Sequence, residues 1–186
     1  MNVLDLAILG ILLVNIMLGY AFGVIRRGIA LLGVFAGVGG ATLTSANTST
    51  YLSGWLASNS VLWAHVVTYA IIVVAVVVLF EVLGAVYQRW INQLMAPLFD
   101  RALGILGGFV VGALEVTLML IVGVGLVKTN LPAGYVYPPA FYTMQQLFYG
   151  SLLAPHFYGL EPLTRAIFSM VLPGDLANYF TQLLPH

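Results

Sequence analysis

Four long apolar runs, separated by shorter polar stretches, dominate the pattern of hydrophobic and polar positions along the chain. These runs cover Val3–Ile25, Ile29–Leu43, Leu62–Tyr87 and Ala102–Val127. A helix rises about 1.5 Å per residue, so a run of roughly 20 apolar residues can cross the hydrocarbon core of a bilayer. β-branched residues fill the third run, but a single segment in lipid must satisfy its own backbone, which requires a helix. The pattern predicts an all-α integral membrane protein with about four transmembrane helices.

The polar stretches between the runs predict how these helices are connected. Gly28 follows Arg26 and Arg27 and is expected to permit a tight reversal between the first two helices. The stretch from Thr44 to Ser60 is rich in Ser, Thr, Asn and Gly, which favours an exposed loop.

The character of the chain changes after Lys128. Prolines and glycine interrupt the helical pattern, and aromatic side chains, which favour the headgroup layer, become frequent. Short helices are expected at Thr143–Leu153, Pro162–Leu172 and Leu176–Leu184. Asp175 is the expected N-cap of the last one. We expect residues 129–186 to form an interfacial helical tail, on the membrane or over the bundle, and residues 1–128 to form the transmembrane domain. A fifth, poorly formed span is the alternative for the tail.

Composition supports a membrane location and limits the classes of partner. Hydrophobic residues make up 61% of the 186 residues and charged residues only 6%, and the mean hydropathy is +1.04. A soluble domain carries roughly a quarter charged residues, so membrane lipid is the expected partner of much of this surface. Six basic residues balance six acidic ones. Without a cluster of Lys and Arg, nucleic acid is excluded as a partner. The lack of cysteine excludes disulfides and thiolate metal sites.

The distribution of positive charge predicts the orientation in the membrane. Arg26 and Arg27 lie between the first two runs, and Arg89 and Arg101 lie between the last two. The connection between the second and third runs carries no charge. Because basic loops stay cytoplasmic, both termini are expected to face outward.

Glycines at a spacing of four residues predict close helix packing. Residues four apart share one face of a helix, and a face of glycines lets a second backbone approach closely. The candidate helix-packing positions are Gly19, Gly23, Gly33, Gly37, Gly104, Gly108 and Gly112. We expect the glycine face of the fourth span to pack against the first span, within one copy of the chain or between copies.

Three polar side chains fall inside the predicted spans, namely Asn15, Glu81 and Glu115. A carboxyl group in the bilayer is unfavourable unless it is neutral, paired or facing water. Glu115 is therefore expected either to line a proton or solute path or to form a hydrogen bond with Asn15 or Thr117. Glu81, nearer the inner end of its span, is expected to pair with one of the arginines Arg27, Arg89 and Arg101.

Five charged residues are placed at the predicted boundaries of the membrane: Asp5, Arg26, Arg27, Asp100 and Arg101. Asp5 is expected at the outer interface, where a carboxylate stabilises the N-terminus of a helix.

No arrangement of residues in the sequence indicates catalysis or a bound metal or cofactor. His65 opens the third run beside aromatic residues, and a lone histidine there is more often amphipathic than a haem ligand. A nucleophile–base pair, a metalloprotease motif and a phosphate-binding loop are all missing from the sequence. We therefore expect a protein that is not an enzyme and has no cofactor.

Three of these features together resemble the CvpA (colicin V production protein) family. They are Asp5, the ending Gly19-Tyr-Ala-Phe-Gly23-x-x-Arg26 of the first run, and the pattern Asp100-Arg101-x-x-Gly104-x-x-x-Gly108-x-x-x-Gly112. The order and spacing of the four spans agree with that family, and the resemblance covers about residues 1–128. Val111 stands where many members of the family carry a basic residue.

The resemblance implies a protein of the bacterial inner membrane that is involved in toxin production or export and in envelope homeostasis. Two other classes of function remain open at the level of the sequence. One is a small oligomeric channel or transporter with Glu115 in its path. The other is an accessory subunit of a larger membrane complex. Further copies of the chain or other membrane subunits are accordingly the candidate protein partners.

Overall fold

The computed structural model describes residues 2–53, 61–87, 97–127 and 139–181, and all the regular secondary structure in these ranges is helical. The helices are α1 (Val3–Phe22), α2 (Val24–Ser53), α3 (Val61–Val86), α5 (Pro97–Val127), α6 (Pro139–Tyr149), α7 (Ala154–Tyr158), α8 (Glu161–Ile167) and α9 (Leu176–Thr181). Among the described residues, α1, α2, α3 and α5 are the helices long and apolar enough to cross a membrane. The expected multi-pass, all-α fold is confirmed.

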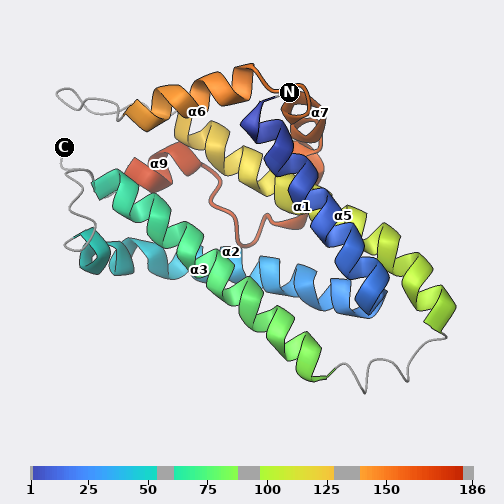
Figure 1. Ribbon diagram of the computed structural model, residues 1–186. Coiled ribbons are helices and arrows are strands. Elements are labelled where there is room, and N and C mark those ends of the chain that lie inside the picture. The colour runs from blue at the N-terminus through green and yellow to red at the C-terminus, as the bar shows by residue number, and fades with distance from the viewer. Residues whose placement is uncertain (1, 54–60, 88–96, 128–138, 182–186) are drawn as a thin grey trace.

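Two pairs of antiparallel helices form the bundle (Figure 1). One pair consists of α1 and α5, and in it Gly19 lies against Gly104 while Asn15 lies against Gly108. In the other pair, Gly37 of α2 lies against the backbone of α3 at Val73. The two pairs meet where α2 contacts α5. α3 therefore packs on α2 and stands apart from most of α5.

The turn between α1 and α2 lies at Gly23, five residues before the glycine expected to form it. Gly23 has φ +84°, a backbone conformation that glycine adopts without strain. The carboxylate of Asp100 accepts a hydrogen bond from the backbone N–H of Val24, at 2.9 Å, and so caps the first turn of α2. The prediction of a turn at Gly28 was wrong. As a result, Arg26 and Arg27 belong to the first turn of a helix and are not part of a loop.

The helix α2 also continues beyond the apolar run that predicted it. Residues 44–53, which were expected to form a loop, are helical. The hydroxyl of Thr44 donates to the carbonyl oxygen of Gly40 at 2.7 Å, and that of Thr48 donates to Thr44 at 3.0 Å. These bonds to the preceding turn satisfy polar side chains within a helix, so the polar composition did not end it. The remainder of the predicted loop, residues 54–60, lies outside the described residues.

The short helices of the tail pack over one end of the bundle, against α5 and its neighbours (Figure 1). α6 and α7 contact α1 and α5, whereas α9 contacts α3 and α5. Hydroxyls of the bundle bond to the backbone of the tail: Thr42 donates to the carbonyl oxygen of Val171 at 2.8 Å, and Thr117 donates to that of Phe157 at 3.2 Å. The predicted N-cap of α9 is present, because Asp175 accepts from the backbone N–H of Asn178 at 3.1 Å.

Candidate functional site

A cluster of ionic and amide side chains joins all four spanning helices. It consists of Asn15 from α1, Arg26 and Arg27 from α2, Glu81 from α3 and Glu115 from α5. Arg27 Nη2 lies 2.5 Å from Glu81 Oε1, and Arg27 Nη1 donates to Asn15 Oδ1 at 3.1 Å. Asn15 Nδ2 in turn donates to Glu115 Oε2 at 2.8 Å. The two carboxyl groups are thus linked through one guanidinium and one amide.

Burial makes these contacts necessary for the fold. The residue Arg27 is only 1% exposed, and a buried charge without a partner destabilises a protein strongly. Arg26 lies beside it, with Nε 3.4 Å from Glu81 Oε2 and the guanidinium carbon 3.8 Å from the centre of the Phe22 ring. Both arginines therefore share one carboxylate, and Asn15 carries the network on to the second.

The structure contains two of the pairings that the sequence suggested. Glu81 pairs with Arg27, one of its three candidate partners, and Glu115 accepts from Asn15. Thr117, the other candidate partner of Glu115, instead donates to backbone carbonyl oxygens. The bond from Arg27 to Asn15 was not predicted, because the sequence was taken to place Arg27 in a loop. Arg89 lies outside the described residues.

The seven candidate packing glycines all lie at close contacts. A methyl group at Gly19 would collide with the carbonyl group of Gly104, and one at Gly108 would collide with the carbonyl oxygen of Asn15. Gly112 faces Leu12 and Asn15, Gly33 faces Phe80, Gly37 faces Val73, and Gly23 faces Asp100. The glycine contact between the fourth and first spans forms within one copy of the chain. It brings the backbones close enough for the side chain of Asn15 to reach Glu115.

The remaining boundary charges have separate positions. Asp100 caps α2, as described above, and Arg101 is exposed with its guanidinium carbon 5.9 Å from the centre of the Tyr20 ring. Asp5 is fully buried and forms a capping box with Asn2 at the start of α1. The capping role of Asp5 was predicted, but the same carboxylate also holds the tail. It accepts from the hydroxyl of Ser151 at 2.5 Å and from two backbone N–H groups of the tail at 3.0 Å.

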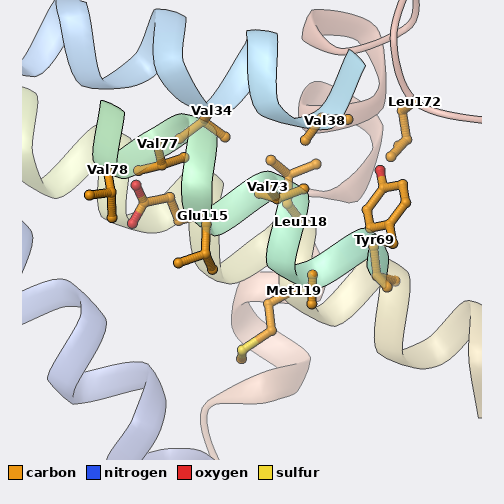
Figure 2. Close-up of a pocket in the computed structure, with 13 residues that line it drawn as sticks. Val34, Val38, Tyr69, Val73, Val77, Val78, Glu115, Leu118, Met119 and Leu172 are labelled. Carbon is orange, nitrogen blue, oxygen red and sulfur yellow. The ribbon is translucent and has the colours of Figure 1, made fainter. Parts of the chain in front are cut away.

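An apolar groove of about 400 Å³ lies beside the cluster, between α3 and α5. Six valines of α2 and α3 line it, together with Leu118, Met119 and Val122 of α5 and with Tyr69, Ala70, Glu115 and Leu172. Figure 2 shows the carboxyl group of Glu115 beside Val77 and Val78, with Tyr69 near the opposite end. Glu115 is therefore shared between the charged cluster and the groove.

Comparison with known proteins identifies the family. A sequence model of the Colicin V production protein family matches residues 4–161. The chain belongs to this family. No curated protein and no solved structure matches the chain. The resemblance was expected to end at about residue 128, but the family match continues through α6 and α7 and ends at the first residue of α8. Part of the tail therefore belongs to the Colicin V production fold.

The family match includes every residue of the charged cluster, whereas a second polar cluster depends on the chain beyond it. Ser45 lies 3.1 Å from His65 Nε2 and 2.7 Å from the hydroxyl of Tyr179, which also donates to the carbonyl oxygen of Thr42 at 2.8 Å. Burial raises the pKa of Tyr179 above its usual value. The sequence did not reveal this cluster, because its members are brought together only when α9 packs against the bundle.

The second polar cluster explains the burial of His65, which was expected at an interface. His65 and Ser45 are both fully buried, and the His65 ring packs 5.0 Å from Tyr179 and 5.3 Å from Phe180, measured between ring centres. Within the described ranges, no group of three or more metal-ligating side chains is close enough together to hold a metal ion. The contacts of Ser45 and His65 with Tyr179 and Phe180 attach α9 of the tail to α2 and α3.

Proposed function

We propose that this member of the Colicin V production family is a non-enzymatic protein of the bacterial inner membrane. In this proposal it supports the production and export of a colicin V-like peptide toxin and contributes to envelope homeostasis. The observation that carries the proposal is the family match over residues 4–161, which includes the four spans and the whole charged cluster.

The geometry favours a role without catalysis. A catalytic nucleophile needs an adjacent base and access to its substrate. The nearest such arrangement among the described residues is Ser45 with His65, and both side chains are fully buried. The polar groups of the charged cluster instead bond to one another between helices. Such a cluster fixes the relative positions of the four spans.

The proposal is tested in a toxin-producing strain that lacks its own family member. Expression of the chain should restore toxin activity in the medium, and an empty vector should not. Leakage of a periplasmic reporter enzyme, measured in the same cultures, reports on the envelope. Normal insertion of the chain into the membrane without any recovery of released toxin would contradict the export role.

We also propose that both termini face outward. The end of α1, the start of α2, the end of α3 and the start of α5 lie at one end of the bundle, together with Arg26, Arg27 and Arg101 (Figure 1). Residues 43–63, which include the last part of α2 and the start of α3 at the opposite end, contain no charged residue. The positive-inside rule assigns the arginine-bearing end to the cytoplasm.

A second candidate function is a small oligomeric channel or transporter. The observation that favours it is the position of Glu115, which bonds to the charged cluster and also lines the groove. In a working flux assay, Glu115→Gln should alter flux while the protein still folds. A third candidate, an accessory subunit, would be favoured instead by a stoichiometric partner that co-purifies with the chain in a native detergent.

A further inference from the structure

The groove between α3 and α5 opens toward lipid. Val74 and Val78 line it, yet they are 61% and 54% exposed. Both belong to a helix that crosses the membrane, so this exposure faces the hydrocarbon core. The volume of the groove, about 400 Å³, falls in the range of small-molecule sites, which is roughly 300–1,000 Å³. A ligand dissolved in the bilayer can therefore reach the groove from the side.

Polar groups stand at the two ends of this apolar groove. Tyr69 and Val78 are nine residues apart on α3, so the groove is roughly 13 Å long. The hydroxyl of Tyr69 is the buried polar group at one end. At the other end, Glu115 uses Oε2 to accept from Asn15. Oε1 of the same carboxyl group takes part in no hydrogen bond with a described residue.

The charged groups around the groove favour a ligand with a positive charge. The lining contains one carboxyl group, that of Glu115, and no basic side chain from the described residues. The nearby arginines, Arg26 and Arg27, contact Glu81 and lie outside the lining. A cation in the groove would thus meet a carboxylate directly. An anion would meet the same carboxylate with no basic side chain in the lining to contact, which is unfavourable in a medium of low dielectric constant.

We propose that this groove is a binding site for a lipophilic cation, with the cationic centre at Glu115 and the apolar part along the valines toward Tyr69. Water fits the groove poorly because the wall offers few hydrogen-bond partners. A neutral hydrocarbon chain would fill the valine-lined part but leave Oε1 of Glu115, which faces the groove, without a partner. The site is a property of the isolated chain, so it does not depend on the role in toxin production.

Equilibrium dialysis with tetraphenylphosphonium tests the proposal on the purified full-length chain in a nonionic detergent. The matched probe is tetraphenylborate, which has the same shape and the opposite charge. Tetraphenylphosphonium should bind saturably, and tetraphenylborate should bind at least about tenfold more weakly. Glu115→Gln should weaken binding of the cation by at least about tenfold. Glu161→Gln makes the same chemical change in α8, outside the groove, and should leave the affinity unchanged.

A second variant separates loss of the site from loss of the fold. Ala70 lines the groove from an exposed position and lies outside the charged cluster. Ala70→Trp should therefore fill the groove, abolish binding of the cation and keep the elution volume of the wild-type chain. Equal affinity for the two probes would overturn the proposal. Undiminished binding of the cation by both Glu115→Gln and Ala70→Trp would also overturn the proposal. So would the absence of saturable binding to the wild-type chain.

Discussion

The guanidinium of Arg27 reaches two other helices from the first turn of α2. It donates to Glu81 on α3 and to Asn15 on α1, and Asn15 extends the contact to Glu115 on α5. An arginine suits this position because its planar fork donates in several directions and stays charged when it is buried. A lysine at the same place would offer one charged centre and could not match the two acceptors equally well.

Replacing Arg27 should destabilise the protein more than any change to an exposed arginine. Arg27→Met leaves Asn15 without a donor and one oxygen of Glu81 without its cation, and breaking a buried pair from one side costs about 3–5 kcal/mol. We expect a lower unfolding midpoint in a titration of the detergent-solubilised protein with sodium dodecyl sulfate. Arg101→Met, at an exposed position, is the matched control and should change stability by less than about 1 kcal/mol. Equal midpoints for the two variants would contradict this account of the cluster.

At the scale of the element, the closest contact in the bundle is that between α1 and α5. A side chain at Gly108 would have to displace the backbone of α1 at Asn15 and Ile16. Gly108→Leu should therefore prevent α1 and α5 from packing, which removes the contact between Asn15 and Glu115 as well. Membrane accumulation and the elution profile of the purified protein measure the effect, and we expect both to deteriorate.

The matched control for this change is Gly10→Leu. Gly10 belongs to the same helix as Asn15, but a methyl group there meets nothing within 4 Å. The Gly10→Leu variant should therefore accumulate normally in the membrane. Normal accumulation and an unchanged elution profile of Gly108→Leu would show that the glycine contact is dispensable.

The apolar runs predicted the four spans, but the ends of the elements depended on contacts that a sequence pattern does not contain. Gly23 forms the turn because Asp100, far away in the chain, caps the helix that follows it. The hydroxyls of Thr44 and Thr48 favour a loop by composition, yet they bond to the preceding turn of α2. Polarity alone does not distinguish these two outcomes.

The polar residues of the candidate site were predictable from the sequence, whereas the groove beside them was not. Glu115 and Glu81 stand out because carboxyl groups are rare in spans, and the need for partners suggested Asn15 and Arg27. The groove was not predictable, since it arises from the separation of α3 and α5 in the packed bundle. The bond between Ser45 and His65 was missed for a related reason, because Tyr179 in the tail completes that cluster.

At the scale of the whole molecule, the two ends of the bundle differ in charge. The end with the start of α2 and the start of α5 carries Arg26, Arg27 and Arg101, whereas the polar last part of α2, at the other end, has no charged residue. Tyr51 lies in the polar last part of α2 and Leu98 lies in the first turn of α5, and both are 79% exposed. The chain has no cysteine, so a single introduced thiol reports on one position only. In intact cells whose outer membrane admits the reagent, Tyr51→Cys should react with an impermeant maleimide. Leu98→Cys should react only after the inner membrane is opened. The reverse pattern would invert the proposed orientation.

The hydrogen bonds of Asp5 have a consequence for the order of events during biosynthesis. Asp5 leaves the ribosome nearly 150 residues before Ser151 and the N–H groups of Leu152 and Leu153. Until then the carboxylate has its local cap at Asn2 but lacks its donors from the tail. The contacts between Asp5 and the tail can therefore form only after α2, α3 and α5 have been synthesised. A chain that stops between residues 127 and 151 contains all four spans, but its Asp5 carboxylate lacks the donors that the tail provides. The exposure of this charge at the start of α1 distinguishes such an unfinished copy from a finished one.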